Sequence, residues 1–272
     1  MTDSAMGQVF LVGTGPGDPD LLTVKAYRLL READVVVHDR LVSPGVMALV
    51  PPGVHRVSAG KEAGRHQMAQ EDINALLLHL ARAGKRVVRL KGGDPFIFGR
   101  GSEEAAYLVA HGVAVEVVPG ITSASGCTAE LGIPLTHRGV ASGVRFVTGH
   151  CRGDGPLDLN WASLADPDTT LVIYMGLSNA AEIAANLIRH GLPAETPAVA
   201  IANGTTAARR DCRGPLRDIA ARIAMAGLQS PVLMVIGRVV ALAGVPEGAI
   251  PASIPGGGWE NALVANALAA GG

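Results

Sequence analysis

Two glycine-rich loops and a third segment with hydroxyl side chains each follow an apolar run in the first half of the chain, and they are the first candidates for holding a ligand. They are residues 13–19 (GTGPGDP), 91–95 (KGGDP) and 119–124 (PGITSA). Glycine lets the backbone turn sharply and lets a ligand approach the main chain, whose N–H groups can donate to it. The pattern favours a nucleotide or nucleoside site, although each segment alone is as typical of a tight turn or a helix N-cap.

The spacing of these glycines excludes two common phosphate sites. The first loop reads G-x-G-x-G, and Pro16 and Pro19 stiffen the place where a pyrophosphate-binding helix would begin. The sequence contains no G-x-x-x-x-G-K-[ST] motif. Asp94 in the second loop has two interpretations: it accepts a hydrogen bond from a ribose or an α-amino group, or it bonds its own backbone in the turn.

Basic side chains at loop positions suggest a second kind of ligand. They are Arg40, Lys61, Arg100 and Arg138. A guanidinium matches a carboxylate with two parallel hydrogen bonds, so several of these residues around one cleft would select an organic polyanion. Scattered surface arginines are the alternative, and the sequence alone leaves both open.

The motifs of metal and covalent catalysis are absent from the sequence, which has neither H-E-x-x-H nor G-x-S-x-G. Cys127, Cys151 and Cys212 are odd in number and scattered, so they predict neither a disulfide framework nor a metal clip. We therefore expect no metal and a reducing compartment.

The elements that must position these loops alternate along the first half of the chain. Short β-branched runs predict strands, and apolar residues at helical spacing predict helices between them. The strands are expected at residues 9–12, 35–37, 87–90 and 113–118, and the helices at 22–30, at 73–80 before Gly84, and from an N-cap at Ser102 to Ala110. This alternation is typical of a mainly parallel sheet with helices on both faces.

A second sheet is expected in the rest of the chain. Residues 119–143 have weak periodicity and are interpreted as a crossover between domains 8–120 and 121–245. Strands are then predicted at residues 144–148, 170–174, 199–201 and 232–236, with helices around 183–187 before Gly191 and around 216–223. The Gly/Pro/Ala-rich residues 246–272 are predicted to be a flexible tail.

Composition restricts the class of protein. A chain of 272 residues that is 48% hydrophobic and 17% charged can bury a sizeable core. Its 23 basic and 24 acidic residues give a net charge of -1, which disfavours general nucleic-acid binding. No basic segment precedes an apolar N-terminal run, and no apolar run reaches the roughly 18 residues of a membrane helix. We expect a cytoplasmic protein without a membrane partner.

Eight short segments, in this order, resemble the tetrapyrrole methylase family. They are VGTGPGDPDLLTVKA, VVVHDRLVSP, SAGKEAG, VVRLKGGDPFIFGRGSEE, VPGITSASG, GIPLTHRG, TLVIYMG and SPVLMVIGRVV. The resemblance implies two α/β/α domains of the class III methyltransferase type, an active site in the interdomain cleft, and a homodimer.

The resemblance also implies the methyl donor, S-adenosyl-L-methionine, with S-adenosyl-L-homocysteine as its product. Because this donor has no pyrophosphate, the missing dinucleotide spacing agrees with it. Met175 would most often be core filling at such a position, but the resemblance makes it a ligand contact. The implied donor contacts are Pro16, Gly92, Gly93, Asp94, Ile97, Thr122, Ser123, Met175 and Gly204.

Within the family, the segments look most like the enzymes that methylate uroporphyrinogen III twice, on rings A and B. The products would be precorrin-1 and then precorrin-2, on the way to sirohaem, cobalamin or haem d1. The resemblance makes Asp39 the proton acceptor and Lys61 the donor, while Arg100 and Glu103 either orient the macrocycle or help to remove the proton. Eight substrate carboxylates would then be met by Arg40, Arg100 and Arg138, with Met175 beside the ring.

Other functions fit parts of the pattern. Within the family, the alternatives are later precorrin methyltransferases, a diphthamide-precursor methyltransferase and a ribosomal RNA methyltransferase. A nicotinamide-dependent oxidoreductase would use the first glycine loop, with Asp39 at the end of the second strand. A third alternative is a binding protein that has the same fold but no catalytic activity.

Overall fold

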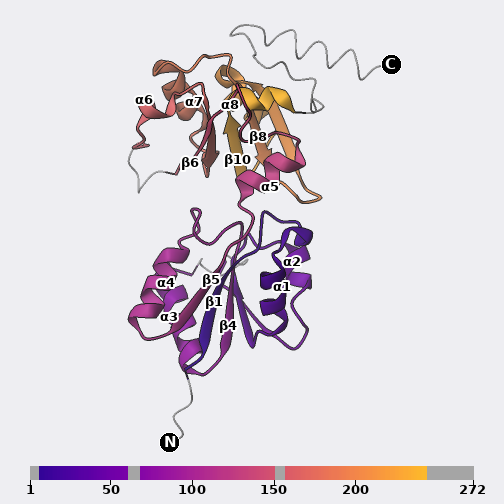
Figure 1. Ribbon diagram of the computed structural model, residues 1–272, viewed down its shortest axis with the longest axis vertical. Helices are drawn as coiled ribbons and strands as arrows, with labels where there is room; N and C mark the ends of the chain where they lie inside the picture. Colours follow the sequence, from indigo (N-terminus) through magenta and orange to yellow (C-terminus); the bar gives the residue numbers. More distant parts are fainter. Residues whose placement is uncertain (1–5, 61–67, 151–156, 244–272) are drawn as a thin grey trace, which may run out of the picture. The chain divides into compact units, whose positions relative to one another are not determined.

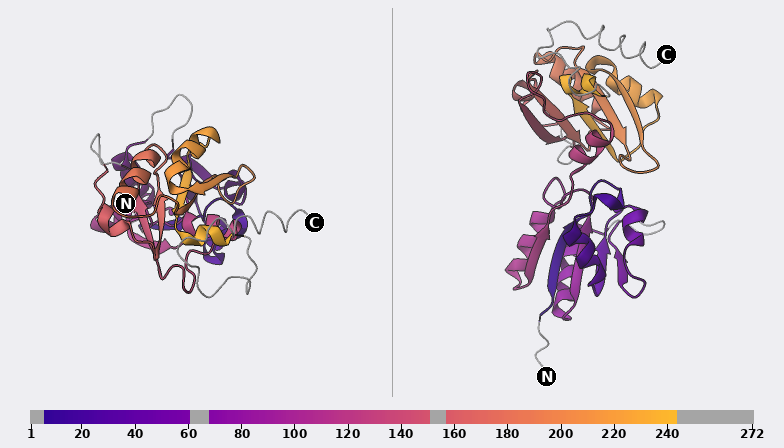
Figure 2. Two further views of the ribbon diagram at one scale, coloured as in Figure 1. Left: turned by 90° about the horizontal axis from the view of Figure 1, so that it is seen from above. Right: turned by 45° about the vertical axis from the view of Figure 1, so that its right-hand side comes forward.

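The computed structural model describes residues 6–60, 68–150 and 157–243 (Figure 1). Contacts within the chain divide it into two compact units, residues 1–126 and 127–272. Each unit has a sheet of its own, which Figure 2 shows from two further directions. The domain ranges 8–120 and 121–245 stay predictions, and the tail 246–272 lies outside the described residues.

The first unit contains a five-stranded parallel sheet in the order β3-β2-β4-β1-β5. Because β1 lies between β4 and β5, the loops that follow these three strands leave the same edge side by side. The strands are β1 (Gln8–Gly13), β2 (Val35–His38), β3 (His55–Ser58), β4 (Arg86–Lys91) and β5 (Ala114–Val118).

Helices cover both faces of this sheet, with α1 and α2 on one side and α3 and α4 on the other (Figure 1). Alternate residues of β4 face opposite sides, as a strand requires: Val88 joins the core under α1 and α2, and Val87 the core under α3 and α4. The helices are α1 (Val24–Arg31), α2 (Pro44–Ala48), α3 (Gln70–Arg82) and α4 (Gly101–Ala110), with a 3-10 turn η1 (Pro19–Leu21) before α1.

Local sequence explains where these helices begin and end. The Thr23 hydroxyl accepts from Ala26 N at 3.1 Å and caps α1, and Ser43 caps α2 in the same way. Gly84, at φ 73°, follows α3 in the left-handed region. The predicted N-cap Ser102 is wrong: the cap is Arg100, which is left-handed at φ 58°, and Ser102 lies inside α4.

The second unit contains a mixed sheet in the order β6-β7-β10-β8-β9. β6 and β7 are parallel, whereas β10 is antiparallel to both of its neighbours. One face is packed by α6, α7 and α8, whose apolar residues share a core with the sheet. The elements are α5 (Ser123–Glu130), which begins in the first unit, β6 (Gly143–Thr148), α6 (Trp161–Leu164), β7 (Thr169–Tyr174), α7 (Ala180–Arg189), β8 (Pro197–Ala202), β9 (Arg210–Pro215), η2 (Leu216–Asp218), α8 (Ile219–Met225), β10 (Val232–Ile236) and η3 (Arg238–Leu242).

The strands predicted from apolar runs are all present, but several short or edge elements were not predicted. β3 and β9 are edge strands with polar sequences, and α5 is built of small residues with little amphipathic pattern inside the predicted crossover 119–143. α6 is a single short turn. In the described ranges, no helix combines the length and apolar character needed to cross a bilayer.

We predict that Leu108→Ala, in the core under α4, lowers the free energy of unfolding by about 2–5 kcal/mol, because it leaves a cavity at a fully buried side chain. The neighbouring Val109 is 61% exposed, so Val109→Ala should change stability by no more than ~0.5 kcal/mol. Denaturant unfolding measures both, and equal effects would contradict the burial of Leu108.

Candidate functional site

The loops after β1 and β4 are joined by main-chain hydrogen bonds. Gly15 N donates to Gly93 O at 3.2 Å, and Gly93 N donates to Gly15 O at 2.7 Å. The Thr14 N–H and hydroxyl both donate to Lys91 O, at 2.9 and 3.1 Å. These loops therefore form one platform at the carboxyl edge of the sheet.

The loop after β5 closes on this platform because glycines stand at the contact points. A Cβ on Gly13 would lie 2.5 Å from Gly120 N, and a Cβ on Gly120 would overlap Gly93 O. The facing backbone occupies the position that a Cβ would take at Gly13 and at Gly120, so alanine at either residue would force the two loops apart. Gly15 and Gly93 differ from these two: their φ of 71° and 69° favours glycine, and their N–H groups already donate to each other's carbonyls within the protein.

Asp94 ties the second and third loops together. Its Oδ1 accepts from Phe96 N at 2.8 Å within the turn, and its Oδ2 accepts from Gly120 N at 3.0 Å. The turn interpretation of Asp94 is thus confirmed. The carboxylate also fixes the distance between the two loops, which the sequence did not indicate.

The other residues expected at the donor site in this unit surround the same edge. Pro16 packs so closely that a Cβ on Gly126 would overlap its ring, and Ile97 N donates to Asp94 O at 3.3 Å. Ser123 is the first residue of α5, and Thr122 O accepts from Gly126 N at 3.1 Å. The structure brings the three predicted loops together within the first unit.

In the second unit, the residues after β7 and β8 have unusual backbone conformations. Met175, Asn203 and Thr205 have φ of 54°, 49° and 60°, a region that costs energy for residues other than glycine. Met175 is 49% exposed, so it is not core filling. A Cβ on Gly204 would overlap the Cys127 sulfur, and burial raises the pKa of this thiol to about 12. The strained conformations of Met175, Asn203 and Thr205 therefore lie just after β7 and β8, where the resemblance implies the donor contacts Met175 and Gly204.

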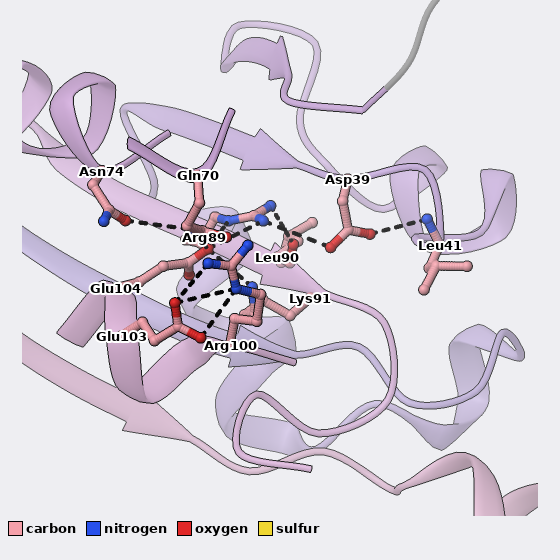
Figure 3. A network of polar contacts seen from close by, with 10 residues as sticks. All are labelled: Asp39, Leu41, Gln70, Asn74, Arg89, Leu90, Lys91, Arg100, Glu103 and Glu104. Atoms are coloured by element: carbon pink, nitrogen blue, oxygen red, sulfur yellow. Dashed lines mark hydrogen bonds and ion pairs between the residues drawn. The ribbon is translucent and has the colours of Figure 1, made fainter. Parts of the chain in front are cut away.

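A buried polar network lies at the end of β2 and β4 (Figure 3). Asp39, directly after β2, accepts from Leu41 N at 2.9 Å through Oδ1, and its Oδ2 lies 3.7 Å from Arg89 Nη2. Arg89 also contacts Glu104 Oε1 at 3.4 Å, and Lys91 Nζ contacts the same oxygen at 3.0 Å. Two buried cations therefore meet one fully buried carboxylate, with Asp39 at the partly exposed end.

Sequence reasoning missed Arg89 and Glu104 as site residues. The available signal was Arg89 itself, a charge inside the apolar run 87–90, which is costly in a buried strand unless it is paired. Desolvation is the largest cause that lowers the pKa of Lys91, followed by the neighbouring Arg89.

Arg100 and Glu103 form an exposed ion pair at the start of α4 (Figure 3). Arg100 Nε donates to Glu103 Oε1 at 3.0 Å, and Nη2 donates to Oε2 at 2.6 Å. This hydrogen bonding raises the pKa of Arg100 and lowers the pKa of Glu103. The pair therefore favours carboxylate recognition by Arg100 over proton removal by either residue.

The remaining expected residues are distributed over the chain. Arg40 is exposed in the first unit, beside Asp39, and Arg138 is exposed in the second. Lys61 lies outside the described residues. Within the described part of the chain, no group of three or more His, Cys, Asp or Glu side chains is arranged to hold a metal ion.

The two sheets and their connections define the class, the two-domain α/β fold of the class III methyltransferases. Residues 8–220 match the family model described as Tetrapyrrole (Corrin/Porphyrin) Methylases. The chain therefore belongs to the tetrapyrrole methylase family.

Several characterised proteins are similar over most of this chain. The uroporphyrinogen-III C-methyltransferase of Paracoccus denitrificans (strain Pd 1222) is 55% identical over 240 residues, covering 88% of this chain and 84% of the relative. The siroheme synthase of Stutzerimonas stutzeri (strain A1501) is also 55% identical, but this chain spans only 51% of its length. The crystal structure of uroporphyrin-III C-methyl transferase from Thermus thermophilus, complexed with S-adenyl homocysteine, has 45% identity and a TM-score of 0.74, covering 87% of this chain and 100% of that one.

We predict that Gly204→Ala lowers the free energy of unfolding by about 1–3 kcal/mol, because the new methyl group overlaps the Cys127 sulfur. Adding Cys127→Ala should restore part of this loss by removing the sulfur. Gly53→Ala, where a Cβ meets nothing within 4 Å, is the control. A Gly204→Ala variant with the parent's unfolding midpoint would contradict the packing described here.

Proposed function

We propose that this chain is a uroporphyrinogen-III C-methyltransferase that uses S-adenosyl-L-methionine. The observation that carries the proposal is the 55% identity to the Paracoccus enzyme over 88% of this chain. The joined glycine loops support it, because they offer a shaped backbone surface and lack the features of a pyrophosphate site.

The donor residues are proposed from the loops described above. In the first unit they are Pro16, Gly92, Gly93, Asp94, Ile97, Thr122 and Ser123, of which Asp94 acts by holding two loops at a fixed distance. In the second unit they are Met175 and Gly204. When bound, the donor supplies an electrophilic methyl group on a sulfonium.

The acceptor is proposed to be uroporphyrinogen III, methylated twice to precorrin-2 by way of precorrin-1. In each step a pyrrole carbon forms a bond to the methyl carbon, the carbon–sulfur bond breaks with its electron pair going to sulfur, and the macrocycle loses one proton. Asp39 accepts this proton. Lys61 is the proposed proton donor: a proton that it gives to one position of the macrocycle is matched by a second proton lost from another position, so the net loss stays one. Arg40, Arg100, Arg138 and Met175 hold the macrocycle. Arg100 meets a substrate carboxylate in competition with Glu103, its partner in the free protein.

Assembly and location are part of the proposal. The family resemblance supports a homodimer, and the three scattered cysteines, which favour a reducing compartment, support a cytoplasmic location. Light scattering coupled to size-exclusion chromatography distinguishes a dimer from a monomer, and fractionation of cells tests the location.

We predict that anaerobic incubation with S-adenosyl-L-methionine and uroporphyrinogen III adds two methyl groups to the tetrapyrrole, as measured by mass spectrometry. A gain of one methyl group would contradict the double methylation. No gain, with S-adenosyl-L-homocysteine bound in calorimetry, would point to another precorrin as acceptor. Binding of NADPH and not of S-adenosyl-L-homocysteine would favour the oxidoreductase alternative.

We predict that Asp94→Ala weakens S-adenosyl-L-homocysteine binding by about tenfold or more, since Gly120 N loses its acceptor and the loops separate. Arg100→Ala should keep donor affinity within about threefold and lower kcat/KM for the tetrapyrrole by at least about tenfold.

Asp166→Ala is the matched control for Asp94→Ala, because Asp166 also accepts two hydrogen bonds, from Asp168 N and the Thr169 hydroxyl. It lies before β7, whereas Met175 follows that strand. Donor affinity should stay unchanged in this variant. Equal loss of donor affinity in Asp94→Ala and Arg100→Ala would contradict the division into donor and acceptor residues.

A further inference from the structure

Arg89 is a charged residue in the middle of a buried parallel strand. It lies on β4 between Val88 and Leu90, both fully buried, and its own side chain is only 3% exposed. An unpaired charge at such a depth would be strongly destabilising, so each group that meets the guanidinium matters.

All three nitrogens of this guanidinium have a polar partner (Figure 3). Nη1 donates to Leu90 O at 3.0 Å, and Nε and Nη2 both lie 3.4 Å from Glu104 Oε1. Nη2 also faces Asp39 Oδ2 at 3.7 Å. The planar fork therefore holds one orientation, fixed by the strand backbone and by α4.

Glu104 anchors the network from the helix side. Its Oε1 is shared by Arg89, Lys91 and Gln70, the last donating at 3.2 Å, and its side chain is 0% exposed. Oε2 has no hydrogen-bond partner in the described ranges. Glu104 balances only one of the two cations, so Asp39 is the carboxylate that balances the other.

Asp39 differs from the rest of the network in being accessible. Its side chain is 28% exposed, against 3%, 5% and 0% for Arg89, Lys91 and Glu104. Its two oxygens have different partners: Oδ1 accepts a hydrogen bond from Leu41 N at 2.9 Å, and Oδ2 forms an ion pair with Arg89 Nη2 at 3.7 Å. One contact at each oxygen favours a single orientation of the carboxylate plane.

We infer that Arg89 is a positioning residue for Asp39, held in place by Glu104. This inference rests on the proposed function, in which Asp39 accepts the proton that the macrocycle loses after one of its pyrrole carbons has formed a bond to the methyl group. Arg89 touches neither donor nor acceptor in this scheme. It fixes the direction from which the Asp39 carboxylate meets that proton.

The test starts with Arg89→Gln, which should fold because Lys91 still neutralises Glu104 at 3.0 Å. We expect kcat to fall by about tenfold or more, while KM for the tetrapyrrole and the Kd of S-adenosyl-L-homocysteine stay within about twofold. Arg86→Gln is the matched control: Arg86 is on the same strand and its exposed ion pair with Glu32 has no link to Asp39. Equal loss in both variants would overturn the inference.

A double-mutant cycle with Asp39→Asn separates positioning from a structural role. If Arg89 acts through Asp39, Arg89→Gln should cause little further loss of kcat in the Asp39→Asn background. If kcat of the double variant fell by the product of the two single-variant factors, the inference would be overturned.

Arg89→Lys keeps the charge but replaces the fork by a single ammonium, which cannot hold Glu104 and Asp39 in the same geometry. We expect this variant to unfold at the parent's thermal midpoint, while its kcat stays at least about fivefold below the kcat of the parent. Parental kcat in Arg89→Lys would show that charge alone suffices and would also overturn the inference.

A structural measurement, which needs no turnover, distinguishes failure of this inference from failure of the proposed function. Crystal structures of the parent, Arg89→Gln and Arg89→Lys should show the Asp39 carboxylate rotated away from its parental orientation in both variants. An unchanged Asp39 would overturn the inference even if uroporphyrinogen III proves not to be the acceptor. Absence of methylation by the parent, with Asp39 rotated in the variants, would instead overturn only the proposed function.

Discussion

The contact of three loop backbones at one edge of the first sheet is the constraint on which the rest of the site depends. The Gly15–Gly93 pair joins two loops, and Gly120 brings the third against them. Gly13 and Gly120 leave no room for a Cβ, whereas Gly15 and Gly93 have φ of 71° and 69°, a region that favours glycine, so the backbone geometry requires these glycines before any ligand is considered. The Asp94 carboxylate then fixes the spacing by accepting from two backbone N–H groups.

This arrangement changes how the glycine loops are interpreted. In a dinucleotide site the loop presents free amides and a helix N-terminus to a pyrophosphate. Here the Thr14, Gly15 and Gly93 N–H groups are bonded within the protein. What remains is a rigid surface of defined shape, which suits a ligand recognised by apolar and carbonyl contacts better than a phosphate.

The sequence predicted the parts of the fold that depend on apolar burial. Central strands such as β1 and β10 are continuous buried runs, so their pattern is strong. The edge strand β9 buries less side-chain surface, so its sequence is polar and lacks the apolar run that predicts a strand. The loops were found because glycine and proline mark turns, whereas the partners of Asp94 and Arg89 depend on residues that only folding brings together.

The two parts of the site in the first unit also differ in how their precision is achieved. The glycine platform is built mainly from neutral backbone, so its geometry follows from main-chain hydrogen bonds and from the missing Cβ atoms, with Asp94 as the one charged group that ties the loops. The network around Asp39 is built from charges, and burial makes each of its members depend on the others. Glu104 alone leaves one of the cations Arg89 and Lys91 without a counter-ion, and the accessible carboxylate of Asp39 completes the balance. The same electrostatic requirement that stabilises a charged strand therefore sets the orientation of the group proposed to receive the proton, so stability and reactivity are coupled at Arg89.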